Sequence, residues 1–458
     1  MHIIMDIFNW LIAAGHTVLL PVIITIIGMI FGLRIDKSFK SGLTLGIGFA
    51  GIKLILDFMT TNVGPAAKAM VERTGAHLTA LDVGWGSIAA VTWASPIIAI
   101  LIFAILAVNI ILLILKRTHT LDVDIWNYHH MAIVGVMVYF VTKNIVLGVG
   151  ASVVMSLITF KLADWSQPMT EKFFGMPGVS LPTVSALSSL VIAWPLNWLL
   201  DRIPFMRKNK FSIRDAQKYL GFFGDSMIMG LLIGMAIGFF AGYNLMNIMQ
   251  LGVSMAAVLV LIPKMTSLFM EGLLPISDSA QKWSQKRFKG RQLFIGLDAA
   301  VVVGNADVIT TALIIIPLTI LMALILPGNQ VLPFADLAVV PFRVALVVAL
   351  TNGNLLKNII IGLVVTASLL WCGTSTAPVL TAIAKSVGIK LGANSLYISS
   401  FAATSMIQSF AVYFAFTWHP LLSIPVLLII FGGVWYFFDG IKHVNAAMDE
   451  QNSQNVNA

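Results

Sequence analysis

An acidic residue, Asp307, lies inside an apolar run over residues 293–326, in the segment Gly304-Asn305-Ala306-Asp307. A carboxylate at membrane depth costs about 2.5–3.5 kcal/mol on insertion scales, so such residues usually face a cavity or a ligand. Asn305 and Asp307 could therefore contact a polar ligand. Alternatively, Asp307 could cap a helix that begins at Val308.

Four other polar clusters interrupt apolar sequence. They are residues 81–87 with Asp82 and Trp85, 126–130 with His129 and His130, 175–183 with Pro182 and Thr183, and 271–277 with Glu271. Every hydroxyl of a polyol both donates and accepts hydrogen bonds, so carboxylates, amides and imidazoles suit it. An indole can cover a C–H face of such a ligand. These clusters favour a neutral polyhydroxyl ligand, although Arg343 keeps an anionic ligand open.

Each cluster also has an interpretation without a ligand. Asp82 could cap a helix at the membrane surface, and the two histidines could belong to an interfacial aromatic belt. The Gly- and Pro-rich residues 175–183 could form an external loop. Glu271, followed by Gly272 and Pro275, indicates either the tip of a hairpin or a turn where the chain leaves the membrane.

No cofactor or metal motif accompanies these clusters. The sequence has no dinucleotide-binding glycine pattern, no P-loop, no HExxH and no cysteine pair. We therefore expect no cofactor, no metal and no catalytic residue of the chain's own. Cys372, the one cysteine, lies in an apolar stretch and is interpreted as a packing residue.

Composition places these clusters in a membrane protein. Of 458 residues, 58% are hydrophobic and 10% charged, whereas soluble domains are about 25% charged. The pattern predicts an all-α polytopic membrane protein with about eleven spans. The predicted spans are 8–33, 41–61, 87–115, 131–160, 179–200, 222–243, 247–270, 308–326, 341–371, 396–417 and 420–438. Shorter apolar pieces that could be re-entrant are 43–52, 293–303 and 376–384.

Basic residues predict the orientation. Seventeen lie in four loops, 34–40, 116–117, 202–218 and 264–291, against four in the opposite loops. The positive-inside rule places the four loops in the cytoplasm, the N-terminus outside and the C-terminus inside. This rule accounts for the net charge of +8, and no nucleic-acid motif is present. The basic loops 202–221 and 282–292 either reflect topology alone or dock an acidic cytoplasmic partner.

The sequence divides into a membrane domain, residues 1–445, and a polar tail, residues 446–458, predicted to be disordered. The two halves of the sequence show a weak internal similarity, called the echo below, between residues 41–50 and 290–299 and between the contexts of Asp82 and Asp336. The echo indicates either a structural repeat, as in many transporters, or chance similarity.

Several stretches together resemble the galactitol branch of enzyme IIC, the membrane component of the bacterial phosphoenolpyruvate-dependent sugar phosphotransferase system. They are GLTLGIGFAGI (42–52), VGPAAKAMVE (63–72), LDVGW (81–85), DIWNYHH (124–130), EGLLPIS (271–277), IGLDAAVVVGNADV (295–308) and LPGNQVLPFADLAVVPF (326–342). The pair Asn305-Ala306 departs from the more apolar or histidine-containing pair expected in that branch, which leaves the polyol open.

The resemblance implies a homodimer in the bacterial inner membrane. It also implies the ascorbate-type enzyme IIC fold, with a dimerisation domain and a core with re-entrant hairpins that moves like an elevator. A separate enzyme IIB, carrying a phosphocysteine recharged from enzyme IIA, would phosphorylate the substrate. By this analogy the ligand contacts are Asp82, Trp85, His129, His130, Pro182, Thr183, Glu271, Asn305 and Asp307.

Two hypotheses about function follow. The first is translocation of a hexitol or pentitol, with galactitol favoured, coupled to its phosphorylation. The alternative is an ion-coupled secondary transporter of a small polar solute, in which Asp307 and Glu271 serve as coupling carboxylates.

Overall fold

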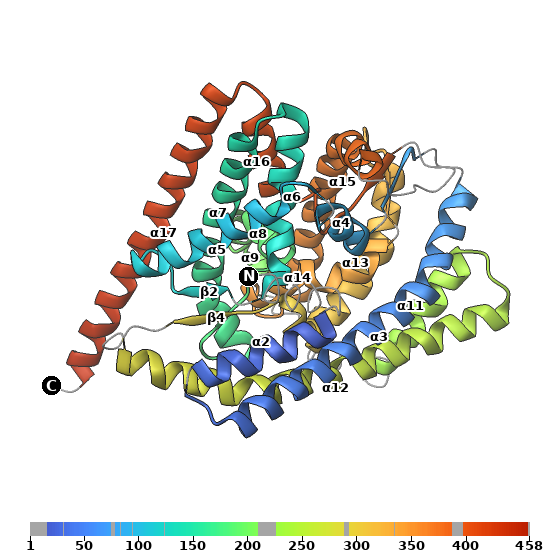
Figure 1. The fold of residues 1–458 in the computed structure, drawn as a ribbon. Coiled ribbons are helices and arrows are strands. Elements are labelled where there is room, and N and C mark those ends of the chain that lie inside the picture. The colour runs from blue at the N-terminus through green and yellow to red at the C-terminus, as the bar shows by residue number, and fades with distance from the viewer. Residues whose placement is uncertain are drawn as a thin grey trace.

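The computed structural model describes residues 16–30, 32–74, 78–82, 84–93, 95–122, 124–208, 226–287, 293–333, 335–386 and 397–456. These residues form mainly α-helices, together with two small parallel sheets (Figure 1). The predicted helical class is confirmed. The basic residues at 209–218 and 288–292, and the first fifteen residues, lie outside the described part of the chain.

The helices and strands fall into two consecutive series. The first series is α2 (His16–Ile30), α3 (Ile35–Thr74), β1 (Ala80–Asp82), α4 (Gly84–Trp93), α5 (Ile98–Ile114), β2 (Thr120–Asp122), α6 (Ile125–Thr142), α7 (Ile145–Phe174), β3 (Val179–Ser180), α8 (Val184–Leu200) and the short α9 (Pro204–Lys208). The second is α11 (Ser226–Phe240), α12 (Leu245–Arg287), β4 (Phe294–Gly296), η2 (Ala299–Val301), α13 (Ala306–Ile325), β5 (Val331–Leu332), η3 (Ala335–Val339), α14 (Val340–Leu350), α15 (Leu355–Ser386), β6 (Tyr397–Ser399), α16 (Ile407–Thr417) and α17 (Pro420–Val456).

The order of elements repeats between the two series. Each begins with a helix of 15 residues and a helix of at least 40 residues, followed by a short strand. By this order β1 corresponds to β4. The echo between residues 41–50 and 290–299 is therefore wrong, because 41–50 lie inside α3 whereas 294–296 form β4. The similarity between those segments came from glycine-rich apolar composition.

The two sheets exchange strands between the series. One sheet has the order β5-β1-β6 and is called the β1 sheet here; the other, β2-β4-β3, is called the β4 sheet. Each central strand comes from one series and both of its neighbours from the other. In the β1 sheet Ala80 pairs with Val331 and with Tyr397, and in the β4 sheet Ile295 pairs with Leu121 and with Val179. Helices follow the carboxyl ends of these strands, as α4 follows β1, α6 follows β2 and α8 follows β3.

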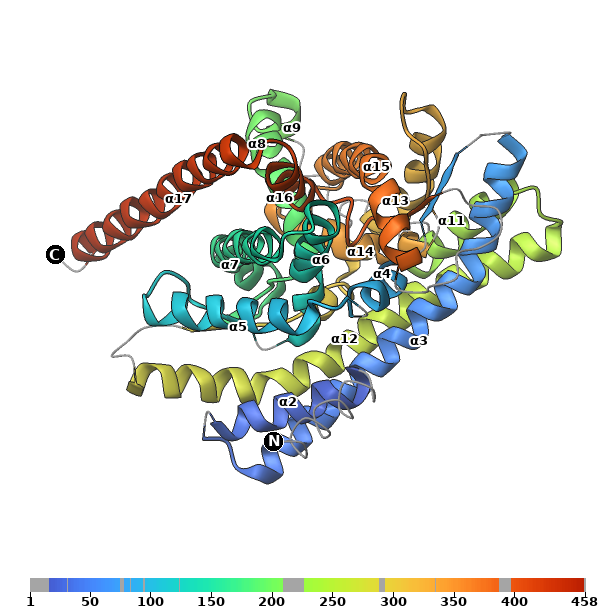
Figure 2. The ribbon, with the colours of Figure 1, turned by 45° about the horizontal axis from the view of Figure 1, so that its top comes forward.

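A separate layer of helices crosses one side of the molecule. It consists of α2, α3, α11 and α12, which pack along one another beside the body that holds both sheets (Figures 1 and 2). The two long helices touch closely at Gly272, where a Cβ atom would lie 2.8 Å from the backbone oxygen of Ser41. Gly272 thus permits helix contact rather than breaking the chain.

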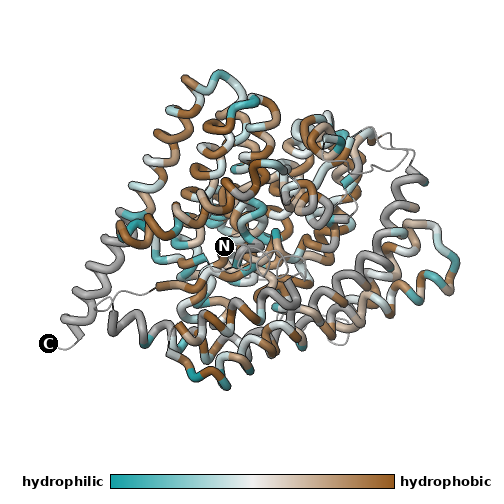
Figure 3. The backbone as a smooth tube through the Cα atoms, viewed as in Figure 1, coloured by the Kyte–Doolittle hydropathy of each residue, from teal (hydrophilic) through white to brown (hydrophobic). Residues whose placement is uncertain are grey.

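Hydrophobic residues fill the helices of the body (Figure 3). In the described part of the chain four helical segments are long and apolar enough to cross a membrane: Ile145–Phe174, Ala306–Ile325, Leu355–Ser386 and Pro420–Asp439. Shorter apolar helices are Ile100–Ile114, Val184–Leu200, Gly230–Phe240, Leu245–Ala257, Val340–Leu350 and Ile407–Thr417. Several apolar helices are thus confirmed, whereas the count of eleven spans stays a prediction.

Some predicted segments have other boundaries or another conformation in the structure. The span 131–160 contains the turn between α6 and α7, where Asn144 caps α7 by accepting hydrogen bonds from the N–H groups of Val146 and Leu147. The pieces 43–52 and 376–384 are not separate, because they lie within α3 and α15. The break predicted at 293–303 is present as β4 and η2. The helix α17 continues through Val456, over most of the tail predicted to be disordered.

Candidate functional site

The carboxylates at the β1 sheet are held by backbone N–H groups. Asp82 accepts from Gly84 N (3.2 Å) through Oδ1 and from Asp336 N (2.8 Å) through Oδ2. Asp336 in turn accepts from Trp85 N (2.8 Å), Ala402 N (3.0 Å) and the Ser400 hydroxyl (2.6 Å). Both carboxylates are fully buried. Because both oxygens of each already accept hydrogen bonds, Asp82 and Asp336 tie three segments of chain together.

Thr183 occupies the centre of the equivalent region at the β4 sheet. Its hydroxyl oxygen accepts from Ala299 N at 2.7 Å and donates to Asn127 Oδ1 at 3.1 Å. Asn127 Nδ2 donates to Asp122 Oδ1 at 3.2 Å, and Asp298 accepts from Ala300 N at 2.7 Å. These bonds join the ends of all three strands of the sheet.

The β4 sheet differs from the β1 sheet in its charge. Asp122, Asp124 and Asp298 are near enough to repel one another. Among the described residues, Asp122 Oδ2 is buried and has no hydrogen-bond partner. At the β1 sheet, by contrast, the buried cation Arg343 attracts both Asp82 and Asp336. A buried cation therefore accompanies the carboxyl groups at one sheet, whereas three carboxyl groups adjoin one another at the other.

His129 and His130, two of the predicted ligand contacts, are buried in the first turns of α6. This helix follows β2, a strand of the β4 sheet. Their rings are 3.9 Å apart at 67°, and the Trp85 ring lies 6.3 Å from that of His129. Within the described part of the chain neither ring nitrogen of His130 has a hydrogen-bond partner. The structure therefore brings Trp85 and both histidines together, from clusters forty residues apart in sequence.

The helix α16 adds two residues to this region. Gln408 Nε2 donates to the backbone oxygen of Val184 at 3.2 Å, next to Thr183. Gln408 Oε1 and Ser409 Oγ are buried without a hydrogen-bond partner among the described residues. The helix α16 packs on both α6 and α8, the helices that follow β2 and β3. Asp122, His130, Gln408 and Ser409, with their unfilled polar atoms, are called the polar centre below.

The segment around Asp307 is a helix start, but its cap is Asn305. The Asn305 side chain accepts from Asp307 N (2.9 Å) and Val308 N (3.3 Å), and α13 begins at Ala306. The interpretation of Asp307 as the cap is therefore wrong. Asp307 lies in the first turn, half-buried, with Oδ2 facing the tight turn at Gly353 between α14 and α15. A carboxylate there is favoured by the positive end of the helix dipole.

The interpretation of Glu271 as a hairpin tip is wrong. The helix α12 runs without interruption from Leu245 to Arg287, and the Glu271 side chain is exposed in its middle. The neighbouring Gly272, which suggested a break, faces α3 instead. Glu271 is therefore placed on the helix layer rather than with the polar centre.

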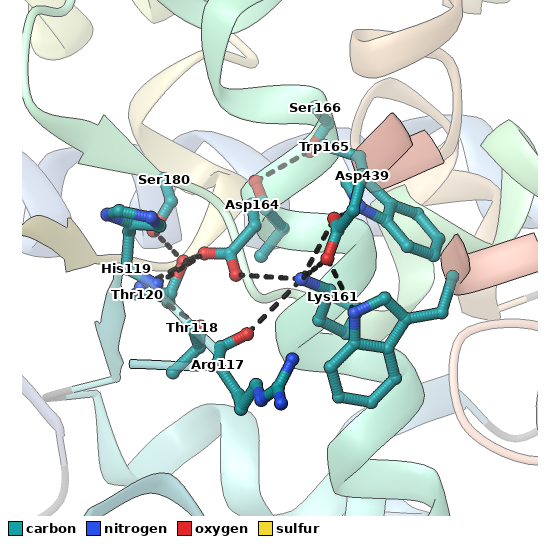
Figure 4. Close-up of polar contacts among 12 residues, drawn as sticks. Arg117, Thr118, His119, Thr120, Lys161, Asp164, Trp165, Ser166, Ser180 and Asp439 are labelled. Atoms are coloured by element: carbon teal, nitrogen blue, oxygen red, sulfur yellow. Dashed lines mark hydrogen bonds and ion pairs between the residues drawn. The ribbon is translucent and has the colours of Figure 1, made fainter. Parts of the chain in front are cut away.

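A polar cluster fastens the last helix to the β4 sheet (Figure 4). Lys161 Nζ on α7 lies 3.2 Å from both carboxylate oxygens of Asp439 on α17 and 3.9 Å from Asp164 Oδ2. Asp164 accepts from the N–H (3.0 Å) and the hydroxyl (2.9 Å) of Thr120 in β2. The indole of Trp165 donates to Asp439 at 3.0 Å. Lys161 thereby links α17 to the start of the strand whose other end carries Asp122.

The sequence analysis missed Asp122, Asp298, Gln408 and Ser409. A signal for the first two was present, because Leu-Asp occurs at 81–82, 121–122 and 297–298, each time at or just beyond the end of a strand. No comparable signal marked Gln408 or Ser409. Polar residues are frequent near this position, and only the packing of α16 shows which of them lack partners.

Comparison with known proteins identifies the family of this chain. The family "PTS system sugar-specific permease component" matches residues 11–394. The "PTS system galactitol-specific EIIC component" of Escherichia coli K12 is 38% identical over 383 residues, which cover 84% of this chain and 85% of that protein, and its O157:H7 counterpart matches equally. A "Putative permease IIC component" of strain K12 is 36% identical over 399 residues, 87% of this chain and 91% of that protein. The chain therefore belongs to the family of sugar-specific permease components of the phosphotransferase system.

Proposed function

We propose that this chain takes up galactitol as the membrane permease component of a phosphotransferase system. The observation that carries the proposal is the 38% identity with a galactitol-specific component over 85% of its length. The substrate would enter from outside and leave inward as its phosphate. The chemistry of the polar centre supports a neutral polyol independently of the sequence identity.

The unfilled atoms of the polar centre suit hydroxyl groups. Imidazole nitrogens, an amide oxygen, a hydroxyl and a carboxylate oxygen can each accept from a polyol hydroxyl, and several can donate. Leaving a buried polar atom unpaired costs about 1–3 kcal/mol. A ligand that satisfies these atoms regains that free energy. Trp85, beside His129, offers an aromatic face to the C–H groups of the same ligand.

Phosphorylation is assigned to separate proteins. Cys372, the single cysteine, is buried within α15 and is not placed to carry a phosphoryl group. We propose that a cytoplasmic enzyme IIB supplies it from a phosphocysteine and is recharged by enzyme IIA. The basic segments 202–221 and 282–292 would dock enzyme IIB, with residues 282–287 forming the end of α12 rather than a loop. This docking would put the C-terminus in the cytoplasm and the N-terminus outside the bacterial inner membrane.

The division of the helices suggests how transport occurs. We propose that residues 1–445 form one membrane domain and that two copies of the chain form a homodimer. The layer of α2, α3, α11 and α12 would form the dimerisation part, because its helices pack mainly against one another along one side of the body (Figure 2). The body, which holds the polar centre, would move across the membrane as an elevator. Thr183 and Asp307 remain proposed contributors to ligand binding beside the polar centre, whereas the side chains of Asp82 and Asn305 accept hydrogen bonds from the backbone and hold the chain in place.

The alternative, ion-coupled transport through Asp307 and Glu271, has less support. Glu271 is exposed on α12, whereas Asp307 faces the turn between α14 and α15. A pair of coupling carboxylates is expected to share one buried site with the solute. The family match also favours phosphorylation-coupled uptake.

Uptake by membrane vesicles separates the two mechanisms. Vesicles with the purified chain and labelled galactitol should accumulate galactitol phosphate only when the phosphorylated enzymes IIA and IIB are supplied. Accumulation of unmodified galactitol, driven by a proton or sodium gradient without those proteins, would overturn the proposal. A thermal-shift comparison of galactitol with sorbitol, mannitol, ribitol, arabitol and ascorbate identifies the preferred polyol.

A further inference from the structure

A small cavity lies between α8, α13, α14 and α15. Its volume is about 10 Å³, and its polar lining consists of Ser189, Arg343 and Thr366, with aliphatic side chains and Gly362 around them. A space of about 10–15 Å³ holds one water-sized group when it also offers several hydrogen-bonding partners. The cavity thus has room for a single oxygen atom and its hydrogens.

Two of the lining side chains have unused hydrogen-bonding capacity. Arg343 is 3% exposed, yet in the described part of the chain none of its three guanidinium nitrogens has a hydrogen-bond partner. Ser189, 1% exposed, likewise has a hydroxyl without a partner there. Unpaired buried donors are costly, especially on a charged group. The cavity is the place where one incoming group can pair with both side chains.

The charges around Arg343 select a neutral group. The guanidinium is attracted by Asp336 and by Asp82, and its Cζ atom lies 5.3 Å from the centre of the Phe401 ring. These two carboxylates already balance the positive charge. An anion in the cavity would therefore be repelled by them, whereas a neutral oxygen can accept from Arg343 and exchange a hydrogen bond with Ser189.

Two of the helices that line the cavity begin near the two sheets. Ser189 is on α8, which begins directly after Thr183 at the β4 sheet, and Arg343 is in the first turn of α14, which follows Asp336 at the β1 sheet. The helices α8 and α14 pack against each other. The cavity therefore sits where helices that leave the two sheets meet.

We propose that the Arg343–Ser189 cavity is a binding site for one hydroxyl oxygen, filled by a hydroxyl of the transported polyol in the loaded protein and by water in the empty one. The inference rests on the proposed function. Arg343 then fixes the orientation of the polyol by donating to that hydroxyl, and Ser189 completes its hydrogen bonds.

Binding of galactitol to purified protein tests the site. Arg343→Lys keeps the charge but shortens the side chain and removes the planar fork, and Ser189→Val fills the cavity. Each should weaken galactitol binding about 10- to 150-fold, the range of one lost hydrogen bond to a charged group. Ser188→Val, the same change at a buried neighbour on α8 that does not line the cavity, is the control and should bind galactitol as the wild type does.

Deoxygenated ligands identify the source of the oxygen. The polyols 1-deoxygalactitol and 2-deoxygalactitol are compared with galactitol on the wild type and on Ser189→Val. The analogue that lacks the bound hydroxyl should bind the wild type weakly and lose little further affinity in the variant. If every analogue loses affinity equally in the variant, the oxygen comes from water alone and the polyol assignment is overturned.

Other outcomes separate this inference from the proposed function. If the wild type binds galactitol and Ser189→Val, Arg343→Lys and Ser188→Val all bind it equally well, the inference fails while the function stands. If the wild type binds none of the polyols, the proposed function fails first. Should Ser189→Val not fold, Ser189→Ala removes the hydroxyl without added volume and should still bind galactitol more weakly than the wild type.

Discussion

The two three-stranded sheets share one architecture but differ in what their carboxylates contact. At the β1 sheet every oxygen of Asp82 and Asp336 accepts a hydrogen bond, and Arg343 balances their charge. At the β4 sheet three carboxylates repel one another, and atoms of Asp122 and His130 lack partners in the described part of the chain. The β1 sheet is called closed below because groups of the chain itself occupy every carboxylate oxygen. The β4 sheet is called open because some of its polar atoms can still form hydrogen bonds with a ligand.

The difference teaches that a buried carboxylate in a membrane protein is not by itself a ligand contact. Asp82 and Asp122 both follow a Leu at the end of a strand and are both buried. They differ in how many of their oxygens are already occupied. Five substitutions follow, from the largest expected effect to the smallest, and each can break or sharpen the contrast between the sheets.

The largest effect is expected at the closed sheet. Asp336→Ala leaves Trp85 N, Ala402 N and the Ser400 hydroxyl without their acceptor. With about 1–3 kcal/mol for each unpaired buried group, stability should fall by at least about 3 kcal/mol. The melting temperature in detergent measures the loss. A normal melting temperature together with lost galactitol binding would make the β1 sheet a binding site and break the contrast.

At the open sheet, Asp122→Asn should chiefly affect binding. The amide keeps the size of the side chain but replaces an oxygen atom by an NH2 group, so a ligand hydroxyl that donates to that oxygen loses its acceptor. Galactitol affinity should fall by about 1.5–3 kcal/mol, or roughly 10- to 150-fold. Isothermal titration of the folded variant measures this change. Equal affinity in Asp122→Asn and wild type would remove Asp122 from the polar centre.

A smaller loss is expected for His130→Phe. The phenyl ring fills a similar space but offers no nitrogen to the ligand. A neutral hydrogen bond contributes about 0.5–1.5 kcal/mol, so galactitol should bind roughly 2- to 12-fold more weakly. The phenyl ring also removes two buried polar atoms, so the melting temperature of the empty protein should not fall. A lower melting temperature with unchanged affinity would assign His130 to packing instead.

The smallest effect on binding is expected outside both sheets. Asn305→Ala removes the cap of α13 and should lower stability by about 1 kcal/mol without changing galactitol affinity beyond twofold. Asp307→Asn leaves that cap in place. If Asp307→Asn weakens binding while its melting temperature is unchanged, Asp307 contacts the polyol. If both variants bind normally, the binding region is confined to the sheets.

The sequence predicted part of this arrangement, and the reasons are physical. The break near residue 304 was predictable because Gly, Asn and Asp interrupt an otherwise apolar run. Which residue caps the helix was not, because Asn305 and Asp307 are both good N-cap residues and lie two positions apart. The proximity of Trp85 to His129 depends on tertiary packing that local pattern does not encode.

Two misinterpretations have a common origin. Gly272 beside Glu271 suggested the tip of a hairpin, and the glycine-rich residues 43–52 were among the pieces that could be re-entrant, whereas both segments lie in long continuous helices. There Gly42 and Gly272 allow close helix contact, with α2 and with α3. In membrane proteins small residues often mark such contacts. Strand pairing could not be predicted from the sequence either, because strands of two or three residues are too short to show an alternation of polar and apolar side chains.

The exchange of strands between the two series has a consequence for biosynthesis. When Ala80 has been made, its pairing partner Val331 is still about 250 residues from synthesis, and Tyr397 follows later. At about 5–20 residues per second the ribosome needs roughly 10–50 s to supply the first of them. The first half of the nascent chain therefore waits in the bilayer with both edges of β1 open. Two half-chains made separately should yield functional protein only when they are co-expressed.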